Sequence, residues 1–557
     1  MTLPRAPRWA LVAALAASVA LSGYGLAWGV PDRWNVDEQV GKSLRLLAAG
    51  SPLAVVDPAH PQLYNFVLAS ALGAYLAVRV AAGMPMDGLA GVSSWLGLTL
   101  RDPSLAAQLT LVGRGLSVLL GFASLWLLFR IGCRLTGPRA AAWAVACWAV
   151  SLGFIETHHV AKHTPLVVLL VLAVWLACLR CHEAPTLRRW AAAWALGGLA
   201  VTAKLDGAIA LIPLTGLVWL LRRPAAARPA VWGAWAFGAF AGGLAAGWPA
   251  LFTGQWHAYA SAADQVFIGS LPDVSAESAG RLLARAGEIL KQLGMMFSPY
   301  LAWVAAAGVL TWRRTAASPW WRVAALFLAS YGAVAVGFYL RYEGAHTKWL
   351  IHAMPWLSLL AGAWMARAWD RPGAWQRAVV LASLALAAGY TWRADAVFAA
   401  GDSRYRSTRW LVDAVPAGTT VEYFQELDLV FASSVLRAHD VIHYGRRSQP
   451  DVPAGFAQPV DPQARQAYEA RLRRDGPASQ LLVVAVGSDF LGPAPAEDAP
   501  FLYEVLAGRL PAYQLAQEFS CPESFWWSPR PAYTCPVIRI YQRAPSVLAS
   551  ALGEGLQ

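Results

Sequence analysis

Charged residues are scarce in this chain of 557 residues: Asp, Glu, Lys and Arg together make up 14%, against 57% hydrophobic residues. Soluble proteins carry about 25% charged residues, so this composition excludes an ordinary soluble enzyme and indicates a polytopic membrane protein. Acidic residues are the scarcer sign, at 33 against 45 Lys and Arg. Because nearly all the excess is Arg in short breaks between apolar runs, we interpret it as topological and expect no nucleic-acid partner.

About eleven apolar runs are long enough to cross roughly 30 Å of hydrocarbon. They lie near residues 9–29, 108–131, 140–156, 163–180, 189–203, 205–221, 230–252, 293–312, 320–340, 346–366 and 375–392. The first run is too long for a signal-peptide core, and no convincing small-residue cleavage site follows it. We therefore expect a retained first helix and a transmembrane domain over residues 1–392.

Arginine clusters recur at every second break, and the positive-inside rule places all of them in the cytoplasm. They are Arg5/Arg8, Arg130/Arg134/Arg139, Arg180/Arg188/Arg189, Arg222/Arg223/Arg228, Arg313/Arg314/Arg322 and Arg367/Arg371/Arg377. The amino terminus is then cytoplasmic, and the breaks at 30–107, 156–163, near 204, 253–292, 341–346 and after 393 face outward. We expect a multi-pass protein of the cell inner (plasma) membrane.

Residues 63–82 are apolar enough to span but would invert this alternation. We therefore expect an interfacial or re-entrant helix within the first outer loop, 30–107. The alternative is an ordinary span with a compensating crossing elsewhere.

The tail from 393 to 557 differs in composition, with frequent charges and short β-rich runs. Strands are predicted at 419–424, 440–444, 481–486 and 537–541, between helices near 403–415, 462–474 and 500–507. This alternation indicates a small soluble α/β domain with a partly parallel sheet. An odd number of spans would export it to the extracytoplasmic (periplasmic) side. A plain binding module is an alternative interpretation of this domain.

The six cysteines divide between these two regions. Cys133, Cys147, Cys178 and Cys181 lie in or beside spans, where small buried hydrophobes are the expected interpretation. Cys521 and Cys535 lie in the exported domain, where a disulfide closing a Pro-rich loop is plausible.

Two adjacent carboxylates, Asp37 and Glu38, follow the first span. Carboxylates at the end of a membrane helix are costly to desolvate unless they have a partner or a task. A structural pairing with Arg33, Lys42 or Arg45 is one explanation. A chemical role is the other, and sequence does not decide which of the two acids would act.

Three further polar clusters are predicted at the same outer face: ETHHVAKHTP (156–165), TAKLDG (202–207) and RYEGAHTKW (341–349). One shared face is typical of an active site at the rim of a helix bundle. Snorkelling accounts equally well for single cations such as Lys162. His159 and His163 are four residues apart, so they would share one helix face. A divalent metal site is therefore possible, although substrate hydrogen bonds explain these histidines better.

These motifs, in order, carry a resemblance. The acid pair, HPQLY (60–64), Gly113-Arg114, ETHHVAKHTPL, AKLDG and AHTKWLIHAMPWLSLLAG resemble integral-membrane glycosyltransferases of the C-type superfamily. The similarity is to the branch of protein O-mannosyltransferases and lipid A aminoarabinose transferases (family 39-like). The chain departs from the pattern at His163, where relatives often carry an acid.

The resemblance implies an inverting enzyme that moves a sugar from a polyprenyl-phosphate donor (undecaprenyl or dolichyl type) to a hydroxyl or phosphate of a protein, lipid or glycan. Asp37 would be the base, with Glu38 orienting the acceptor or tuning it. Candidate cations for the leaving phosphate are Arg114, Lys204, Arg341 and Lys348. His60, His159, Lys162, His163, Asp206 and His346 would contact substrate.

A transporter or flippase of a lipid-linked or anionic substrate is the alternative from another class. It would also place charges in a helix bundle. Such proteins commonly show internal repeats and charges near the bilayer midplane. We see no internal repeat, and the charges gather at one face, which favours the enzyme.

Overall fold

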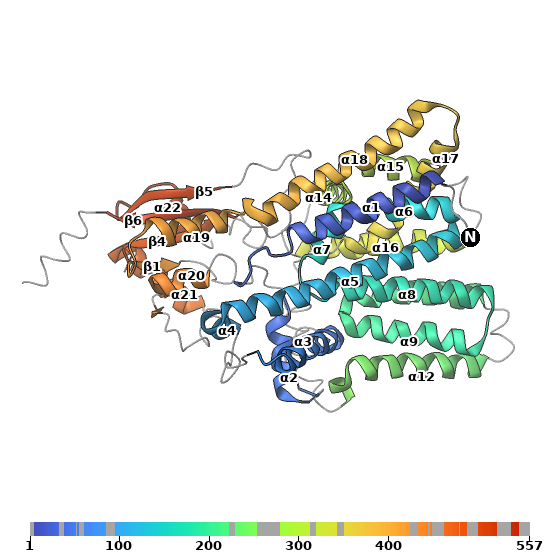
Figure 1. Ribbon diagram of the computed structural model, residues 1–557, viewed down its shortest axis with the longest axis horizontal. Coiled ribbons are helices and arrows are strands. Elements are labelled where there is room, and N and C mark those ends of the chain that lie inside the picture. Colours follow the sequence, from blue (N-terminus) through green and yellow to red (C-terminus); the bar gives the residue numbers. More distant parts are fainter. Residues whose placement is uncertain are drawn as a thin grey trace, which may run out of the picture.

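The computed structural model describes residues 5–32, 38–51, 53–54, 61–84, 95–221, 229–252, 279–311, 319–341, 350–423, 432–443, 446–447, 462–477, 479–486, 500–520 and 536–544. The molecule is elongated, with a helix bundle at one end and a smaller sheet region at the other (Figure 1). The amino terminus lies at the end of the bundle far from the sheet.

Helices dominate the first 401 residues. The first group is α1 (Arg5–Tyr24), α2 (Val40–Ala49), α3 (Leu63–Ala81), α4 (Trp95–Arg101), α5 (Pro103–Leu135), α6 (Pro138–Ala149), α7 (Leu152–His158), α8 (Thr164–Glu183), α9 (Leu187–Ala203), η2 (Leu205–Ala210), α10 (Leu211–Leu220), α12 (Pro229–Gly247) and η3 (Pro249–Phe252). The second group is α14 (Ala279–Phe297), α15 (Pro299–Leu310), α16 (Trp320–Arg341), η8 (Ile351–Ala353), α17 (Met354–Asp370), α18 (Ala374–Ala396) and η9 (Val397–Gly401).

A helix is present at each of the eleven predicted runs, but not every run is one straight helix. Among the described residues, four helices are long and apolar enough to cross a membrane, or six if each bent pair is one span. One bent pair is α6 and α7, at 61°, and the other is α14 and α15, at 108°. The expected run 293–312 is therefore not a straight span. These apolar helices make the chain a membrane protein.

The break between α14 and α15 has a local cause. Pro299 opens α15, and a proline has no backbone N–H with which to continue the preceding helix. Ser298 adopts a positive φ of 74°. Its hydroxyl accepts from the backbone N–H of Tyr300 at 3.3 Å, which caps the new helix.

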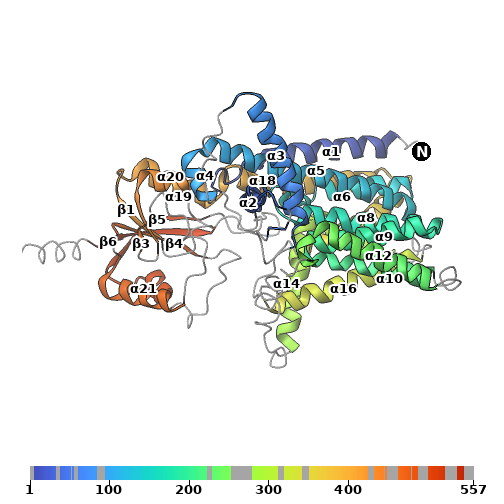
Figure 2. The same cartoon turned by 90° about the horizontal axis from the view of Figure 1, so that it is seen from below.

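The α3 helix is the apolar run that the loop-charge rule excluded as a span. It is 19 residues long and passes the length and composition test for a membrane helix. In Figure 2, however, it runs across the direction of α5, α8 and α9 rather than along it. The interfacial position of α3 stays a prediction.

Small residues bring the bundle helices close together. A Cβ added at Gly198 of α9 would lie 2.3 Å from the backbone oxygen of Phe240, and one at Gly243 of α12 would lie 2.3 Å from that of Ala195. The two backbones are thus in direct contact, as is common where small residues face each other in membrane helices.

The sheet region begins at α19 (Ser403–Ala414) and continues with β1 (Thr420–Tyr423), α20 (Ser433–Ala438), β2 (Asp440–His443), β3 (Arg446–Arg447), α21 (Pro462–Asp475), β4 (Leu481–Val486), α22 (Pro500–Leu506), β5 (Tyr513–Phe519) and β6 (Val537–Arg543). The strand order is β3-β2-β1-β4-β6-β5. Pairs β1/β2 and β1/β4 are parallel, and the others are antiparallel.

Alternation along β4 explains why helices cover both faces of this sheet. Leu481 and Val483 pack with α19 and α20 on one face. Leu482 and Val484 pack with α21 and α22 on the other face, because successive side chains of a strand point to opposite sides. The four predicted strands and three predicted helices are present, whereas β3, β5 and α20 were not predicted.

Candidate functional site

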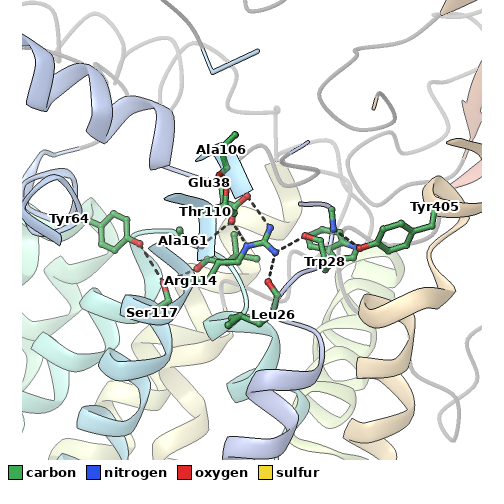
Figure 3. A network of polar contacts seen from close by, with 12 residues as sticks. Leu26, Trp28, Glu38, Tyr64, Ala106, Thr110, Arg114, Ser117, Ala161 and Tyr405 are labelled. Atoms are coloured by element: carbon green, nitrogen blue, oxygen red, sulfur yellow. Dashed lines mark hydrogen bonds and ion pairs between the residues drawn. The ribbon is translucent and has the colours of Figure 1, made fainter. Parts of the chain in front are cut away.

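The centre of the candidate site is a buried ion pair between Glu38 and Arg114. Both side chains are fully buried, and Arg114 Nε lies 2.7 Å from Glu38 Oε1. Arg114 Nη2 donates to the other carboxylate oxygen at 3.2 Å. Its Nη1 donates to the backbone oxygens of Leu26 and Trp28, at 2.7 and 2.6 Å (Figure 3). The guanidinium therefore joins the end of α1, the acid loop and α5.

This pairing changes two of the expected roles. The sequence offered Arg33, Lys42 or Arg45 as structural partners of the acid pair, but the observed partner of Glu38 is Arg114, 76 positions away. Arg114 was expected to bind the donor phosphate, yet its donors point to Glu38 and to two carbonyl groups. The contacts therefore favour a structural role for Arg114 and Glu38 over phosphate binding and base catalysis.

The backbone beside Glu38 is held by the break between α7 and α8. Gln39 donates its N–H to the carbonyl of Ala161 at 2.8 Å. In turn, the N–H of Ala161 donates to Glu38 Oε1 at 3.4 Å. Gly113 explains the Gly-Arg motif, because a Cβ there would lie 2.9 Å from the Cβ of Ala161. Only glycine lets this segment approach α5.

Six of the expected site residues lie outside the described residues: Asp37, His60, His346, Lys348, Cys521 and Cys535. For Arg341 the structure describes the backbone, which ends α16, but not the side chain. Asp37 is the chain neighbour of Glu38, which the structure does describe.

The ETHHVAKHTP cluster is brought to the same place. His158, His159, Lys162 and His163 are at most 4% exposed. His159 and His163 were expected to share a helix face, but residues 159–163 are not helical, so this expectation is wrong. Instead, the His163 ring lies 5.2 Å from that of Tyr64 on α3. Gly121 of α5 leaves room for His158.

Asp395 is a site residue that the sequence analysis missed. It lies near the end of α18 and is fully buried, with Oδ1 3.3 Å from Nδ1 of His159. The other ring nitrogen of His159 faces the backbone oxygen of Leu21 at 3.2 Å. An acid just past the last apolar run is the same signal that singled out Asp37 and Glu38. That signal could have found Asp395.

Lys204 and Asp206 form a second polar group, between α9 and η2. Lys204 Nζ lies 3.0 Å from Asp206 Oδ2, and the two side chains are 20% and 26% exposed. His352 of η8 places Nε2 3.8 Å from the same carboxylate oxygen. The ring of Tyr331 on α16 meets the His352 ring edge-on. Lys204, which was expected to bind the phosphate, and Asp206, which was expected to contact substrate, are thus in contact with each other.

The sheet region contacts the chain just before the acid pair. Trp28 is 1% exposed, and its Nε1 donates to Asp402 Oδ2 at 3.0 Å. The Arg404 guanidinium, paired with Asp402 at 2.6 Å, lies 5.0 Å from the Trp28 ring centroid. Tyr405 accepts from the N–H of Gly29 at 2.8 Å (Figure 3). We call Asp402, Arg404 and Tyr405 the α19 clamp.

A second contact between the two regions lies at α20. The carboxylate of Asp32 accepts from the backbone N–H of Ser433, at the start of α20, at 2.7 Å. At the other end, Arg437 donates to the carbonyl of Thr99 in α4 at 3.3 Å. Burial raises the pKa of Asp32 above its ordinary value, and the Ser433 contacts oppose that rise. Burial also raises the pKa of Tyr405 above its ordinary value.

A search for known families shows what this arrangement is similar to. Residues 104–251 match the family described as dolichyl-phosphate-mannose-protein mannosyltransferase. That segment contains Arg114, the histidine cluster, Lys204 and Asp206. The chain resembles the C-type integral-membrane glycosyltransferases.

A comparison with solved structures shows which known fold this chain resembles. ArnT from Cupriavidus metallidurans bound to undecaprenyl phosphate is 13% identical, with a TM-score of 0.50, over 97% of this chain and 99% of that chain. The apo state of the same ArnT is 13% identical, with a TM-score of 0.49, over 98% of this chain and 99% of that chain. An Archaeoglobus fulgidus oligosaccharyltransferase in the apo form is 12% identical, with a TM-score of 0.42, over 86% of this chain and 69% of that chain. The first of these shows the fold. No curated protein matches the chain.

This C-type fold gives the polar groups their common place. The ends of α1, α5 and α9 that carry them point towards the sheet region in Figure 1, away from the amino terminus. Within the part of the chain that the structure describes, no three His, Cys, Asp or Glu side chains are grouped to hold a metal ion. Cys147, Cys178 and Cys181 are buried thiols, as predicted, and Cys133 is half-buried.

Proposed function

We propose that this protein is an inverting glycosyltransferase that takes its sugar from a polyprenyl-phosphate donor. The acceptor would be a hydroxyl or phosphate group of a protein, lipid or glycan at the outer membrane face. The observation that carries the proposal is the match of residues 104–251 to the family described as dolichyl-phosphate-mannose-protein mannosyltransferase. Arg114, within that match, forms a buried ion pair with Glu38, the neighbour of Asp37 in the chain.

One solved structure and one family description support the choice of donor class. ArnT from Cupriavidus metallidurans, which shares this fold, binds undecaprenyl phosphate in its solved structure. The matched family is described by a dolichyl-phosphate sugar. Both carriers are long isoprenoid phosphates. A helix bundle with one polar end is suited to such a donor, because the isoprenoid can lie in the bilayer while the phosphate meets the polar end.

We assign the base to Asp37 rather than Glu38. Both carboxylate oxygens of Glu38 already accept from Arg114, and the side chain is fully buried. A carboxylate held in this way has no position from which to reach an acceptor hydroxyl. Its paired geometry instead fixes the backbone to which Asp37 is attached, so Glu38 and Arg114 act as positioning residues.

The proposed reaction is a single displacement at the anomeric carbon. The acceptor oxygen forms a bond to that carbon while the bond from the carbon to the phosphate oxygen breaks. The bonding electrons leave with the polyprenyl phosphate, and the acceptor proton passes to Asp37. Attack from the side opposite the leaving group inverts the anomeric configuration.

The leaving phosphate gains negative charge, which fixed cations stabilise where water is limited. Since Arg114 is bound to Glu38, we assign this role to Lys204, Arg341 and Lys348. Lys204 carries the best structural support: its 20% exposed side chain sits at the polar end of the bundle. Asp206 and His352 would hold it in position, while His159, Lys162 and His163 would line the sugar or acceptor side.

The test is transfer of radiolabelled sugar from polyprenyl-phosphate donors to total membrane acceptors by the purified protein. Asp37→Asn is expected to lose at least a hundredfold of the transfer rate while still binding the lipid, because it removes the proton acceptor. Asp413→Asn is the matched control: its carboxylate is 61% exposed and pairs with Arg409 on the surface.

Two results would contradict the proposal. Consumption of no donor by the wild type would favour a transporter or flippase of a lipid-linked substrate. Equal rates for the wild type and Asp37→Asn would leave an enzyme but remove Asp37 as its base.

A further inference from the structure

A groove with a volume of about 440 Å³ lies between α5, α8 and α9, far from the site described above. Its lining is mostly apolar: Trp126, Leu127, Ala173, Leu176, Ala177, Ala192 and Leu196. Two cations complete it, Arg180 at the end of α8 and Arg189 near the start of α9. We call this the Arg180 groove. Its volume falls in the range of roughly 300–1,000 Å³ that is usual for ligand pockets.

The position of the groove along the bundle is well defined. Arg180 and Arg189 flank the connection from α8 to α9, which lies at the end of the bundle opposite the sheet region (Figure 1). The positive-inside rule assigns that end to the cytoplasm. The groove therefore does not belong to the outward site of Glu38, Arg114 and Lys204.

The cations around the groove outnumber the anions. Arg130, Arg134 and Arg189 all lie close enough to act electrostatically on Arg180, with Glu183 as the one carboxylate among these neighbours. Glu183 forms an ion pair with Arg134, with Oε1 3.0 Å from Arg134 Nε. Among the described residues, no carboxylate forms an ion pair with Arg180. An unbalanced positive charge thus lies at the polar end of an apolar groove.

The neighbouring arginines make structural contacts, whereas the Arg180 side chain forms no hydrogen bond or ion pair with the residues that the structure describes. Arg189 donates to the backbone oxygens of Arg180 and Ala184, at 3.0 and 3.2 Å, and so closes the carboxyl end of α8. The Arg130 guanidinium lies 5.2 Å from the ring centroid of Trp126, which is itself 53% exposed. An exposed Trp with Arg above it is typical of the membrane–water interface.

We propose that the Arg180 groove binds an anionic diacyl phospholipid of the cytoplasmic leaflet. The phosphate headgroup would meet Arg180 and its arginine neighbours, and one acyl chain would lie along Leu127, Ala177 and Leu196. Basic pockets between membrane helices on the cytoplasmic side are suited to anionic lipid headgroups. The mostly apolar side chains that line the groove would also make more favourable contacts with an acyl chain than with water.

The test is a lipid titration of the purified full-length protein, followed by native mass spectrometry. The two probes are dioleoyl phosphatidylglycerol and dioleoyl phosphatidylcholine, which differ in net charge but not in acyl chains. We expect the first phosphatidylglycerol to bind about tenfold more tightly. Arg180→Gln should lose about fivefold of this affinity, as expected for one arginine near the surface. Arg180→Lys, which keeps the charge, should bind like the wild type.

Two further variants separate a site from general attraction. Arg188→Gln is the matched control, because Arg188 is an exposed neighbour of Arg189 that does not line the groove. It should bind like the wild type. Ala177→Phe fills the apolar part of the groove without changing any charge, and it should weaken phosphatidylglycerol binding by a similar factor to Arg180→Gln.

Three results would overturn the proposal. Equal losses in Arg180→Gln and Arg188→Gln would show diffuse surface charge rather than a site. Unchanged binding in Ala177→Phe would show that no acyl chain enters the groove. Full competition by glycerol phosphate at similar concentrations would show that the groove takes a small phosphate and not a lipid. None of these readouts depends on sugar transfer.

Discussion

At the scale of single residues, the Glu38–Arg114 pair decides how the acid loop is held. Two opposite charges with no exposed surface interact strongly, but each has lost its hydration. Such a pair is stabilising only while it is intact, because removal of one partner leaves the other charge buried and unpaired. The additional bonds from Arg114 to Leu26 and Trp28 spread this dependence to the end of α1.

Glu38→Gln is therefore expected to destabilise the protein by roughly 3–5 kcal/mol. Arg139→Gln is the control, because Arg139 and Asp370 form an exposed pair whose side chains are 50% and 53% exposed. That change should cost under about 1 kcal/mol. Thermal or denaturant unfolding in one detergent measures both. Equal effects of the two substitutions would show that the buried pair contributes no more than a surface one.

At the scale of elements, close helix packing depends on glycine. The α9–α12 contact places backbone against backbone at Gly198 and Gly243, so a side chain at either position meets a carbonyl group of the partner helix. Gly242 directly precedes Gly243 in the chain, but a Cβ added at Gly242 would have no atom within 4 Å. Gly242 and Gly243 are therefore the same residue type in the same part of α12, but only Gly243 packs against the neighbouring helix.

This difference predicts opposite outcomes for one substitution. Gly243→Val should force α9 and α12 apart and cost about 1–3 kcal/mol, as overpacking usually does. Gly242→Val points into open space and should have little effect. The yield of folded protein and its unfolding midpoint in detergent compare the two variants. A loss of stability in Gly242→Val as large as in Gly243→Val would mean that helix propensity, not packing, dominates at this position.

At the scale of the whole molecule, the sheet region is attached to the chain that leads into the acid pair. The α19 clamp holds Trp28 and Gly29, while Asp32 caps α20. Beyond Asp37, Glu38 is fixed by Arg114. The carboxyl-terminal region thus holds the chain at Trp28, Gly29 and Asp32, shortly before the acid pair.

The clamp is tested by Tyr405→Phe, which removes only the hydroxyl that accepts from Gly29. If the proposed transfer reaction holds, kcat should fall about tenfold while the KM for the lipid donor changes little, because small misplacements of a reacting group are costly. Arg409→Gln is the control, since Arg409 is 84% exposed on the same helix.

Hydrogen exchange at residues 26–32 gives a second readout that needs no activity. It should rise in Tyr405→Phe and not in Arg409→Gln. An unchanged exchange rate together with an unchanged kcat would show that the clamp has no positioning role.

The sequence alone determined the class of protein and much of its layout. Long apolar runs can satisfy their backbone groups in a membrane only as helices, so their positions were readable from composition. The four predicted strands were readable because β-rich runs alternate with helical stretches. The family resemblance followed from ordered motifs such as Gly113-Arg114. Asp37, His60, His346 and Lys348 remain predictions, because they lie outside the described residues.

Only the tertiary structure decided which side chains meet. Arg114 pairs with Glu38 across 76 positions, and Trp28 bonds with Asp402 across 374. Local periodicity carries no information about such distant contacts, because they depend on how helices pack. The bend at Ser298 was hidden for the same reason: an apolar run such as 293–312 has the same composition whether its helix is straight or bent. Composition indicates which secondary structure a segment forms, while tertiary packing decides which distant residues its side chains contact.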